Sequence, residues 1–153
     1  MHNTSPPPWG LLATQFLTLG SLILPDRPRR RRQPRALRRM IGWVTIVTGA
    51  GLSTWAGLRL GPGLTPLPTP PPHSPLQTQG PYRFARHPIY LGLVIAGAGR
   101  WLTSKGPRHL ISCLTLAWAL NAKANLEENI LHQTHEYTRY STRVPRWGVR
   151  LPK

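Results

Sequence analysis

Residues 80–92 of this chain read GPYRFARHPIYLG, and an apolar run follows directly after them. The ring of Pro88 fixes a φ angle that suits the first position of a helix, and it disfavours helical backbone at the residue before it. The stretch therefore predicts a helix that begins at Pro88. Arg86 and His87 would then lie at its N-terminal end, where unpaired backbone N–H groups favour an anion. Both a ligand cradle and a basic loop at lipid headgroups fit this local pattern.

The charge of the chain is strongly unbalanced. It contains 20 lysines and arginines against 4 acidic residues in 153 positions, a formal net charge of +16. Such a balance fits an anionic ligand, an anionic membrane surface or nucleic acid. The length fits one domain or a small membrane bundle. The single cysteine, Cys113, excludes an internal disulfide and is expected to be a small buried residue.

Four apolar runs predict four helices. Residues 9–24 contain no charge, and residues 40–60 begin with 19 uncharged positions. Residues 88–102 and 109–122 are joined by a short Gly-Pro turn, which predicts a helical hairpin. A helix needs about 20 residues to cross a bilayer. We therefore expect an all-α fold, an integral membrane bundle of about four transmembrane helices with a C-terminal hairpin.

The segments between these runs have distinctive compositions. Residues 25–39 hold eight arginines. Because no aromatic residues interleave with them, we interpret the run as a polybasic loop on anionic headgroups rather than a nucleic-acid site. The chain is expected to form a single domain, 1–153. Its predicted parts are a disordered tail (1–8), N-terminal apolar helices (9–60), a proline-rich linker and cofactor loop (61–87), the hairpin (88–122), and a site helix with an interfacial tail (123–153).

The hairpin has a geometric consequence, because the residues before it and after it must emerge on the same side. Arg86 and His87 should therefore lie beside the group Lys123, Glu127 and Glu128. Lys123 and Glu127 are one helical turn apart, so an ordinary surface ion pair is the alternative interpretation. Ionisable groups gathered at a membrane boundary from distant parts of a chain predict a functional site.

Basic and aromatic residues mark the two ends of the bundle. At the hairpin tip, Arg100, Lys105 and Arg108 are expected to extend outward to the headgroups. After the second hairpin helix, residues 132–153 are predicted to form an amphipathic segment on the membrane surface. Its residues Tyr137 and Tyr140 would either line the site or anchor the segment at the interface.

Several motifs together carry a family resemblance. They are Gly-Pro-Tyr-Arg at 80–83, Arg-His-Pro-x-Tyr-x-Gly at 86–92, Glu-Glu-x-x-Leu at 127–131 and Tyr-x-x-Tyr-x-x-x-Val-Pro at 137–145. With the hairpin between them, they resemble the isoprenylcysteine carboxyl methyltransferase family. That family belongs to a wider group of integral-membrane methyltransferases, which includes phospholipid N-methyltransferases. The resemblance covers residues 65–146.

The resemblance implies S-adenosylmethionine as the methyl donor and a lipophilic small molecule as the acceptor. It implies membrane lipid as a partner, no nucleic acid and no metal. The residues expected to bind the cofactor are Leu76, Tyr82, His87, Pro88, Ile89, Tyr90, Glu127 and Glu128. The residues expected to act in catalysis are Arg86, Lys123 and Glu127. Lys123 stands where relatives often have arginine, and a lysine lacks the two-point fork that recognises a carboxylate acceptor.

The resemblance also implies a location, with the cofactor pocket on the cytoplasmic face of a bacterial-type inner or internal membrane. The acceptor stays open among a prenylated thiol, a phospholipid amine, a quinone precursor and a small hydrophobic thiol, and so does the oligomeric state. Three other functions compete with a methyltransferase. They are a membrane reductase that uses a nicotinamide cofactor, a basic nucleic-acid-binding protein and a non-catalytic membrane scaffold.

Overall fold

The computed structural model of the protein describes residues 8–25, 36–63, 76–104 and 106–148. The predictions made for the N-terminal tail, for most of the arginine-rich run, for most of the proline-rich linker and for Lys105 lie outside the described residues.

The described part of the chain is all-helical, as predicted, and contains no strand. Its α-helices are α1 (Pro8–Ile23), α2 (Ala36–Leu60), α3 (Pro88–Ser104), α4 (Pro107–Leu131) and α5 (His135–Arg143). Two short 3-10 helices are η1 (Gly61–Gly63) and η2 (Gly80–Arg83). The helix predicted to begin at Pro88 does so, and the predicted hairpin is formed by α3 and α4.

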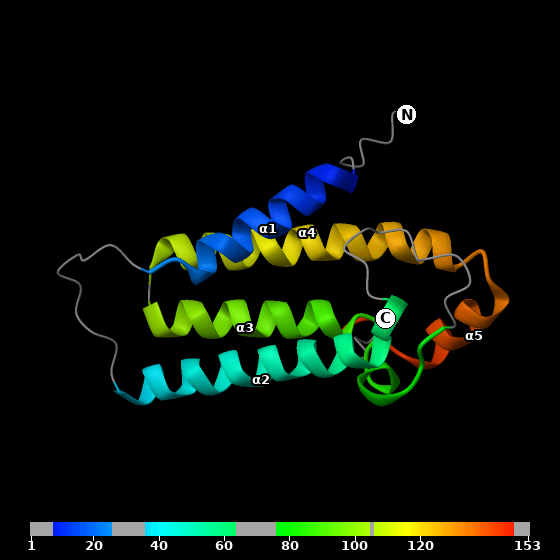
Figure 1. Ribbon diagram of the computed structural model, residues 1–153, viewed down its shortest axis with the longest axis horizontal. Coiled ribbons are helices and arrows are strands. Elements are labelled where there is room, and N and C mark those ends of the chain that lie inside the picture. The colour runs from blue at the N-terminus through cyan, green and yellow to red at the C-terminus, as the bar shows by residue number, and fades with distance from the viewer. Residues whose placement is uncertain (1–7, 26–35, 64–75, 105, 149–153) are drawn as a thin grey trace.

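Helices α2, α3 and α4 lie side by side, and α1 leans across α4 (Figure 1). The end of α1, the start of α2 and the α3–α4 turn lie at one end of the bundle, which we call the tip end. The end of α2, η2, the end of α4 and α5 lie at the other end, which we call the site end. The two chain segments that flank the hairpin therefore emerge together, as expected.

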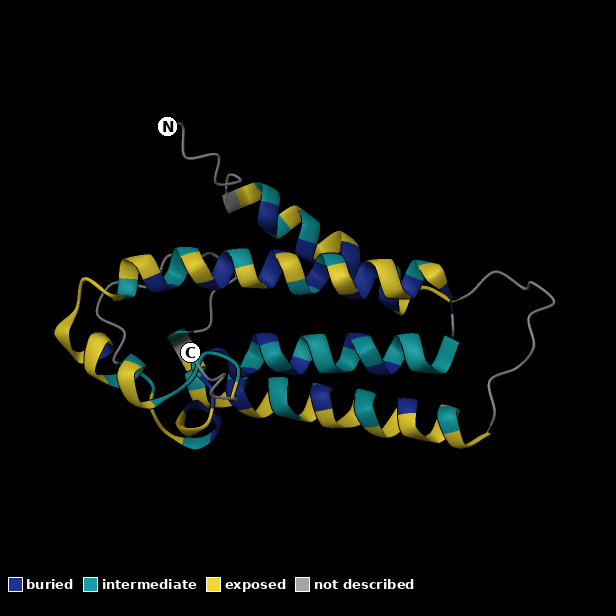
Figure 2. Ribbon diagram, turned by 180° about the vertical axis from the view of Figure 1, so that it is seen from behind, coloured by how far each residue is buried: buried dark blue, intermediate teal, exposed yellow. Residues whose placement is uncertain are grey.

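Glycines allow α2 and α3 to pack closely. A Cβ atom on Gly49 would clash with backbone atoms of Gly92 and Ala96, and one on Gly99 would meet the carbonyl oxygen of Gly42 at 2.7 Å. Small residues at helix interfaces permit such close approach of two backbones. Every residue of α3 is buried or half-buried, so α3 is the central helix of the bundle (Figure 2).

Large apolar side chains are exposed on the outer faces of the other helices. On α2 they include Leu37, Met40, Ile41, Trp43, Val44, Val47 and Leu58, and on α4 they include Ile111, Leu114 and Trp118. Exposed apolar surface of this extent marks contact with a membrane or a protein. Within the described residues, one helix, Ala36–Leu60, is long and apolar enough to cross a membrane. The other three expected spans are not confirmed, since α1 and α3 are short and the last turns of α4 carry charged residues.

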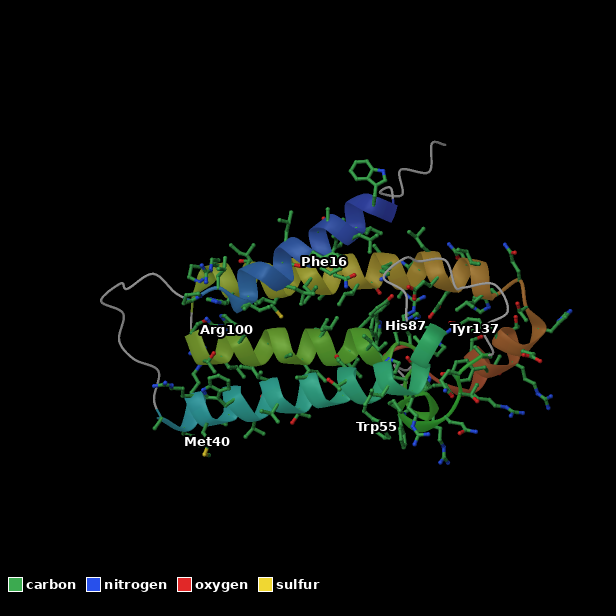
Figure 3. The ribbon with its side chains drawn as sticks, in the orientation of Figure 1. Phe16, Met40, Trp55, His87, Arg100 and Tyr137 are labelled. Atoms are coloured by element: carbon green, nitrogen blue, oxygen red, sulfur yellow. The ribbon has the colours of Figure 1, made fainter. Side chains whose placement is uncertain are left out.

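The two tip arginines that the structure describes do not extend outward as predicted. Arg100 Nε donates to the carbonyl oxygen of Leu22 at 2.9 Å, and Arg108 Nη2 donates to that of Leu24 at 2.7 Å. The last carbonyls of a helix have no partner within the helix and attract cations. The arginines therefore bind the C-terminal end of α1 against the hairpin, and Arg100 lies far from His87 and Tyr137 at the site end (Figure 3).

Candidate active site

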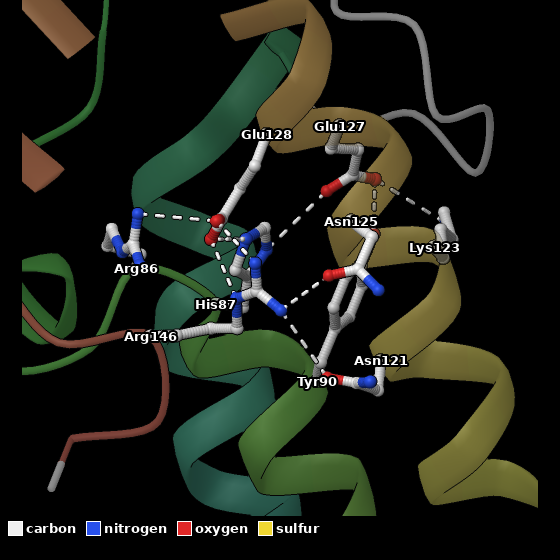
Figure 4. Close-up of polar contacts among 9 residues, drawn as sticks. All are labelled: Arg86, His87, Tyr90, Asn121, Lys123, Asn125, Glu127, Glu128 and Arg146. Atoms are coloured by element: carbon white, nitrogen blue, oxygen red, sulfur yellow. Dashed lines mark hydrogen bonds and ion pairs between the residues drawn. The ribbon is translucent and has the colours of Figure 1, made fainter. Parts of the chain in front are cut away.

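His87 lies between two glutamates of α4. Its Nδ1 is 3.5 Å from Glu127 Oε2, and its Nε2 is 3.0 Å from Glu128 Oε1 (Figure 4). The histidine comes from the segment before α3, and the glutamates come from the last turns of α4, beyond the apolar stretch of that helix. All three side chains are buried or mostly buried. The predicted meeting of residues 86–87 with residues 127–128 is therefore present.

Glu128 is surrounded by positively charged groups. Arg86 Nη1 is 3.3 Å from its Oε2. Arg146 approaches with two donors, because its Nε is 3.0 Å from Oε1 and its Nη2 is 2.5 Å from Oε2. Such two-point pairs between arginine and a carboxylate are strong and directional. Glu128 thus joins three chain segments: the loop before α3, the end of α4 and the segment after α5.

Glu127 has a different environment. Its Oε1 accepts a hydrogen bond from the Tyr90 hydroxyl, and Lys123 Nζ lies 4.0 Å from the same oxygen. The Lys123 ammonium also lies over the Tyr90 ring, 5.2 Å from its centre, and that ring stacks on His87 at 5.3 Å. No arginine is paired with Glu127 among the residues that the structure describes. Its ion-pair contacts, at 3.5 and 4.0 Å, are longer than those of Glu128.

The two carboxyl groups consequently titrate in opposite directions. Burial alone would raise the pKa of Glu128, but hydrogen bonds from His87 and Arg146 and the charge of Arg86 outweigh it and lower that pKa to about 2. Burial raises the pKa of Glu127, although the Tyr90 hydrogen bond and the charges of His87 and Lys123 oppose the rise. Glu128 is satisfied by protein groups, whereas Glu127 is a buried carboxylate that a further cation would stabilise.

The phospholipid methyltransferase family profile matches residues 37–138, about two thirds of the chain. The chain belongs to the phospholipid methyltransferase family. The matched region contains α3 and α4. It also contains the residues gathered around His87, except Arg146 in the segment after α5. Comparison with curated proteins and with solved structures finds no significant match. Membership of the phospholipid methyltransferase family makes the protein a membrane methyltransferase.

Two backbone N–H groups directly before α3 have partners in the segment after α5. The backbone N–H of Arg86 donates to the carbonyl oxygen of Pro145 at 3.0 Å, and that of His87 donates to the carbonyl oxygen of Arg146 at 3.3 Å. The two N–H groups are therefore occupied. Nothing in the sequence indicated that the chain after α5 returns to this point.

Four of the expected cofactor-binding residues lie outside the charged cluster around His87. Tyr82 is buried, and its hydroxyl donates to the carbonyl oxygen of Ala56 on α2 at 3.4 Å. Pro88 is fully buried, and the carbonyl oxygen of Ile89 accepts from Ser53 at 2.9 Å. Leu76 is half-buried in the segment before η2. The contacts of Tyr82 and Ile89 fix α3 and the preceding loop against α2.

Helix α5 does not place its aromatic face on the membrane surface. Tyr137 is 3% exposed, and the Tyr140 hydroxyl donates to the carbonyl oxygen of Tyr82 at 2.6 Å. The exposed positions of α5 are polar or charged and include Arg139. The tyrosines pack inward against the protein, so the site end is covered by the aromatic side of α5.

Sequence reasoning missed Arg146, and with it Asn125 and Trp147. Arg146 Nη1 donates to Asn125 Oδ1 at 2.6 Å, and Trp147 tilts toward the His87 ring at 6.1 Å. Arg146 is one of several arginines in the C-terminal part of the chain, and no periodicity distinguishes it. The available signal was Val144-Pro145 directly before it, because a proline there ends α5 and allows the chain to turn back.

Proposed function

We propose that this protein transfers a methyl group from S-adenosylmethionine to a lipophilic acceptor within the membrane. The observation that carries the proposal is the arrangement of His87 between Glu127 and Glu128, with Arg86, Lys123 and Tyr90 around them. Positive, negative and aromatic groups converge there at a water-poor site. The family profile supports methyl transfer and an acceptor related to lipids.

The chemistry of these residues fits the methyl donor. The methionine part of S-adenosylmethionine carries a carboxylate and an ammonium group, and its sulfur is positively charged. Arg86 has a buried Nε without a hydrogen-bond partner among the described residues, and a ligand carboxylate would satisfy it. Glu127 is a buried carboxylate without an arginine partner, and a ligand ammonium would favour its ionised form. Tyr90 offers an aromatic face to a cation, as it already does to Lys123.

These fits assign a role to each residue. Arg86 would hold the carboxylate of the donor, and Glu127 would hold its ammonium or its ribose hydroxyls. Tyr90 orients Glu127 by its hydrogen bond, and His87 stacks on Tyr90. Lys123, which is 3% exposed, would face the acceptor. The roles of Leu76, Tyr82, Pro88 and Ile89 would be to shape the donor loop.

For a thiolate or carboxylate acceptor, little acid–base chemistry is required of the protein, whereas an amine acceptor would also have to release one proton. When bound, the donor supplies an activated methyl group that leaves with loss of the positive charge on sulfur. Transfer to a thiolate or carboxylate needs alignment of the reacting atoms and exclusion of water. The buried positions of His87, Lys123 and Glu128 serve both requirements. We place the site end at the cytoplasmic face, where a soluble donor has access to Arg86 and Glu127.

The proposal is tested with purified protein in lipid nanodiscs. Calorimetry with S-adenosylmethionine is expected to give binding to the wild type and none to Glu127→Ala or His87→Ala. Incubation with a donor that carries a deuterated methyl group, followed by mass spectrometry of the lipids, is expected to reveal the labelled acceptor. The calorimetry and the transfer assay use the same protein preparation, so donor binding and methyl transfer can be compared directly.

Matched controls exist on α5. Glu136 and His135 are exposed and lie outside the cluster, so Glu136→Ala and His135→Ala are expected to bind the donor like the wild type. Circular dichroism and thermal unfolding establish that each variant is folded. Unchanged donor binding in both Glu127→Ala and His87→Ala would remove the site assignment.

A further inference from the structure

The chain after α5 returns to the site and is held there by its backbone. The carbonyl oxygens of Pro145 and Arg146 accept from the two N–H groups that precede α3. Gly148 follows with a φ of 75°, a left-handed conformation that glycine adopts without strain. Residues 144–148, which we call the return segment, therefore have a defined position beside the cluster.

The side chain of Arg146 is fixed at several points. Besides its two contacts with Glu128, its Nη1 donates to Asn125 at 2.6 Å and to Asn121 at 3.5 Å. The neighbouring Trp147 packs against the buried apolar cluster of α1, α3 and α4. A guanidinium held by one carboxylate and two amide oxygens has little freedom to move.

Arg146 reaches His87 through Glu128. The Oε1 atom of Glu128 accepts from Arg146 Nε at 3.0 Å and lies 3.0 Å from His87 Nε2. A carboxylate fixed by arginine thus contacts one nitrogen of the imidazole and leaves the other, Nδ1, toward Glu127. The partner of one ring nitrogen sets the orientation and proton position of the whole ring.

We infer that Arg146 is a positioning residue, which orients His87 through Glu128 and thereby controls donor binding from outside the donor site. The inference rests on the proposed function for its last step, because donor binding belongs to that function. The contacts from Arg146 to Glu128 and from Glu128 to His87 stand without it. Titratable and charged groups face Glu128 from every neighbouring segment: Arg86 and His87 before α3, Glu127 on α4, Tyr137 on α5 and Arg146 in the return segment.

The first test observes Glu128 directly. The chain contains three glutamates, Glu127, Glu128 and Glu136. Protein labelled with ¹³C at glutamate carboxyl carbons therefore gives a simple NMR spectrum, in which Glu128→Gln identifies one signal. Removal of a neighbouring cation raises a carboxyl pKa by about 1–3 units. In Arg146→Gln the Glu128 titration is expected to move upward by at least about one unit, and Arg146→Lys is expected to recover part of the change.

The second test measures donor affinity against pH by calorimetry. Arg146→Gln is expected to weaken S-adenosylmethionine binding about tenfold or more at neutral pH, where an arginine–carboxylate contact contributes strongly. Its affinity should also begin to fall at a higher pH than that of the wild type, in step with Glu128. A purely structural role would lower affinity without moving this pH. Arg139→Gln, an exposed change on α5, is the control and should behave like the wild type.

The two tests separate two failures. If Glu128 titrates identically in the wild type and in folded Arg146→Gln, the positioning role is wrong, whatever the donor does. A fall in affinity that leaves the pH dependence unchanged also overturns it. If the wild type binds no donor, the proposed function fails, while the NMR titration still decides whether Arg146 controls Glu128.

Discussion

Arg146 and Glu128 form a two-point ion pair, with Nε 3.0 Å from Oε1 and Nη2 2.5 Å from Oε2. Glu128 precedes α5 in the chain and Arg146 follows it, so their ion pair closes a loop of chain that begins at the end of α4. Because His87 and Arg86 contact the same carboxylate, this loop is joined to the start of α3 as well. The site end is therefore stabilised by one glutamate, and the loss of that glutamate should affect stability more than any other acidic substitution.

The first prediction concerns Glu128→Gln. The pKa of this 5% exposed residue is about 2 in the folded protein against an ordinary 4.5. At about 1.4 kcal/mol per unit, the ionised carboxylate contributes about 3 kcal/mol to the free energy of unfolding. Since the folded pKa is lowered, this contribution is complete above pH 4.5 and is lost as the pH falls through about 2. Denaturant unfolding in detergent should thus give a variant that is less stable at pH 7, with a difference that shrinks below pH 4.5.

Glu136→Gln is the matched control for this measurement, since Glu136 is exposed on α5 and should unfold like the wild type at every pH. Glu127 is present in both proteins, but the charge of Glu128 contributes to its raised pKa, so Glu128→Gln lowers the pKa of Glu127 as well. A difference between wild type and Glu128→Gln that stays constant from pH 7 to pH 3 would contradict the assignment of the lowered pKa.

The second prediction compares two glycines of α2. A Cβ atom on Gly49 would overlap backbone atoms of Gly92 and Ala96, whereas one on Gly51 would meet nothing within 4 Å. Gly49→Ala should therefore lower the free energy of unfolding by about 1–3 kcal/mol, because the backbone of α3 must move. Gly51→Ala should be neutral or stabilising by up to about 1 kcal/mol, because alanine favours helix. Thermal unfolding in the same detergent checks both variants. Equal stabilities of Gly49→Ala and Gly51→Ala would show that α2 and α3 can move apart without a loss of stability, and would contradict the prediction.

The third prediction separates the tip end from the site end. Substituting Arg100 and Arg108 together by methionine removes their hydrogen bonds to the last carbonyls of α1. Hydrogen bonds to charged groups contribute about 1.5–3 kcal/mol, so the last turn of α1 should exchange its amide hydrogens about tenfold faster or more. Hydrogen exchange with mass spectrometry measures this. Donor binding should stay the same, and Arg39→Met, an exposed change at the tip end, is the control.

Most of the helical framework could be predicted from the sequence. Pro88 marked the start of α3, and the Gly-Pro turn marked the hairpin, because proline acts on the backbone through local geometry. The meeting of His87 with Glu127 and Glu128 followed from the hairpin alone. The packing of α1 on α4 was not predicted, since the apolar pattern of α1 does not specify which helix it contacts.

The return segment could not be predicted for a different reason. Its position depends on the two-point contact of Arg146 with Glu128 and on backbone hydrogen bonds to Arg86 and His87. These contacts join residues far apart in the chain, and a backbone carbonyl leaves no pattern in a sequence. The tip arginines were misplaced for the same reason, because their partners are the backbone carbonyls of Leu22 and Leu24.

The last prediction tests whether Lys123 acts on the acceptor or only supports Glu127. Its ammonium is buried, lies 4.0 Å from Glu127 and faces the Tyr90 ring, so its charge is only loosely paired. If it attracts an anionic acceptor, Lys123→Met should lower kcat/KM for the acceptor about 10- to 100-fold, the value of one charged hydrogen bond. The donor dissociation constant, measured by calorimetry, should change far less, and Lys123→Arg should restore part of the activity because it restores the charge. Equal losses of donor affinity and of transfer would instead mean that Lys123 acts through Glu127, and no loss of either would leave it a packing residue. Since methionine matches the length and apolar stem of lysine, a failure to fold is the least expected outcome, and thermal unfolding of the variant checks it.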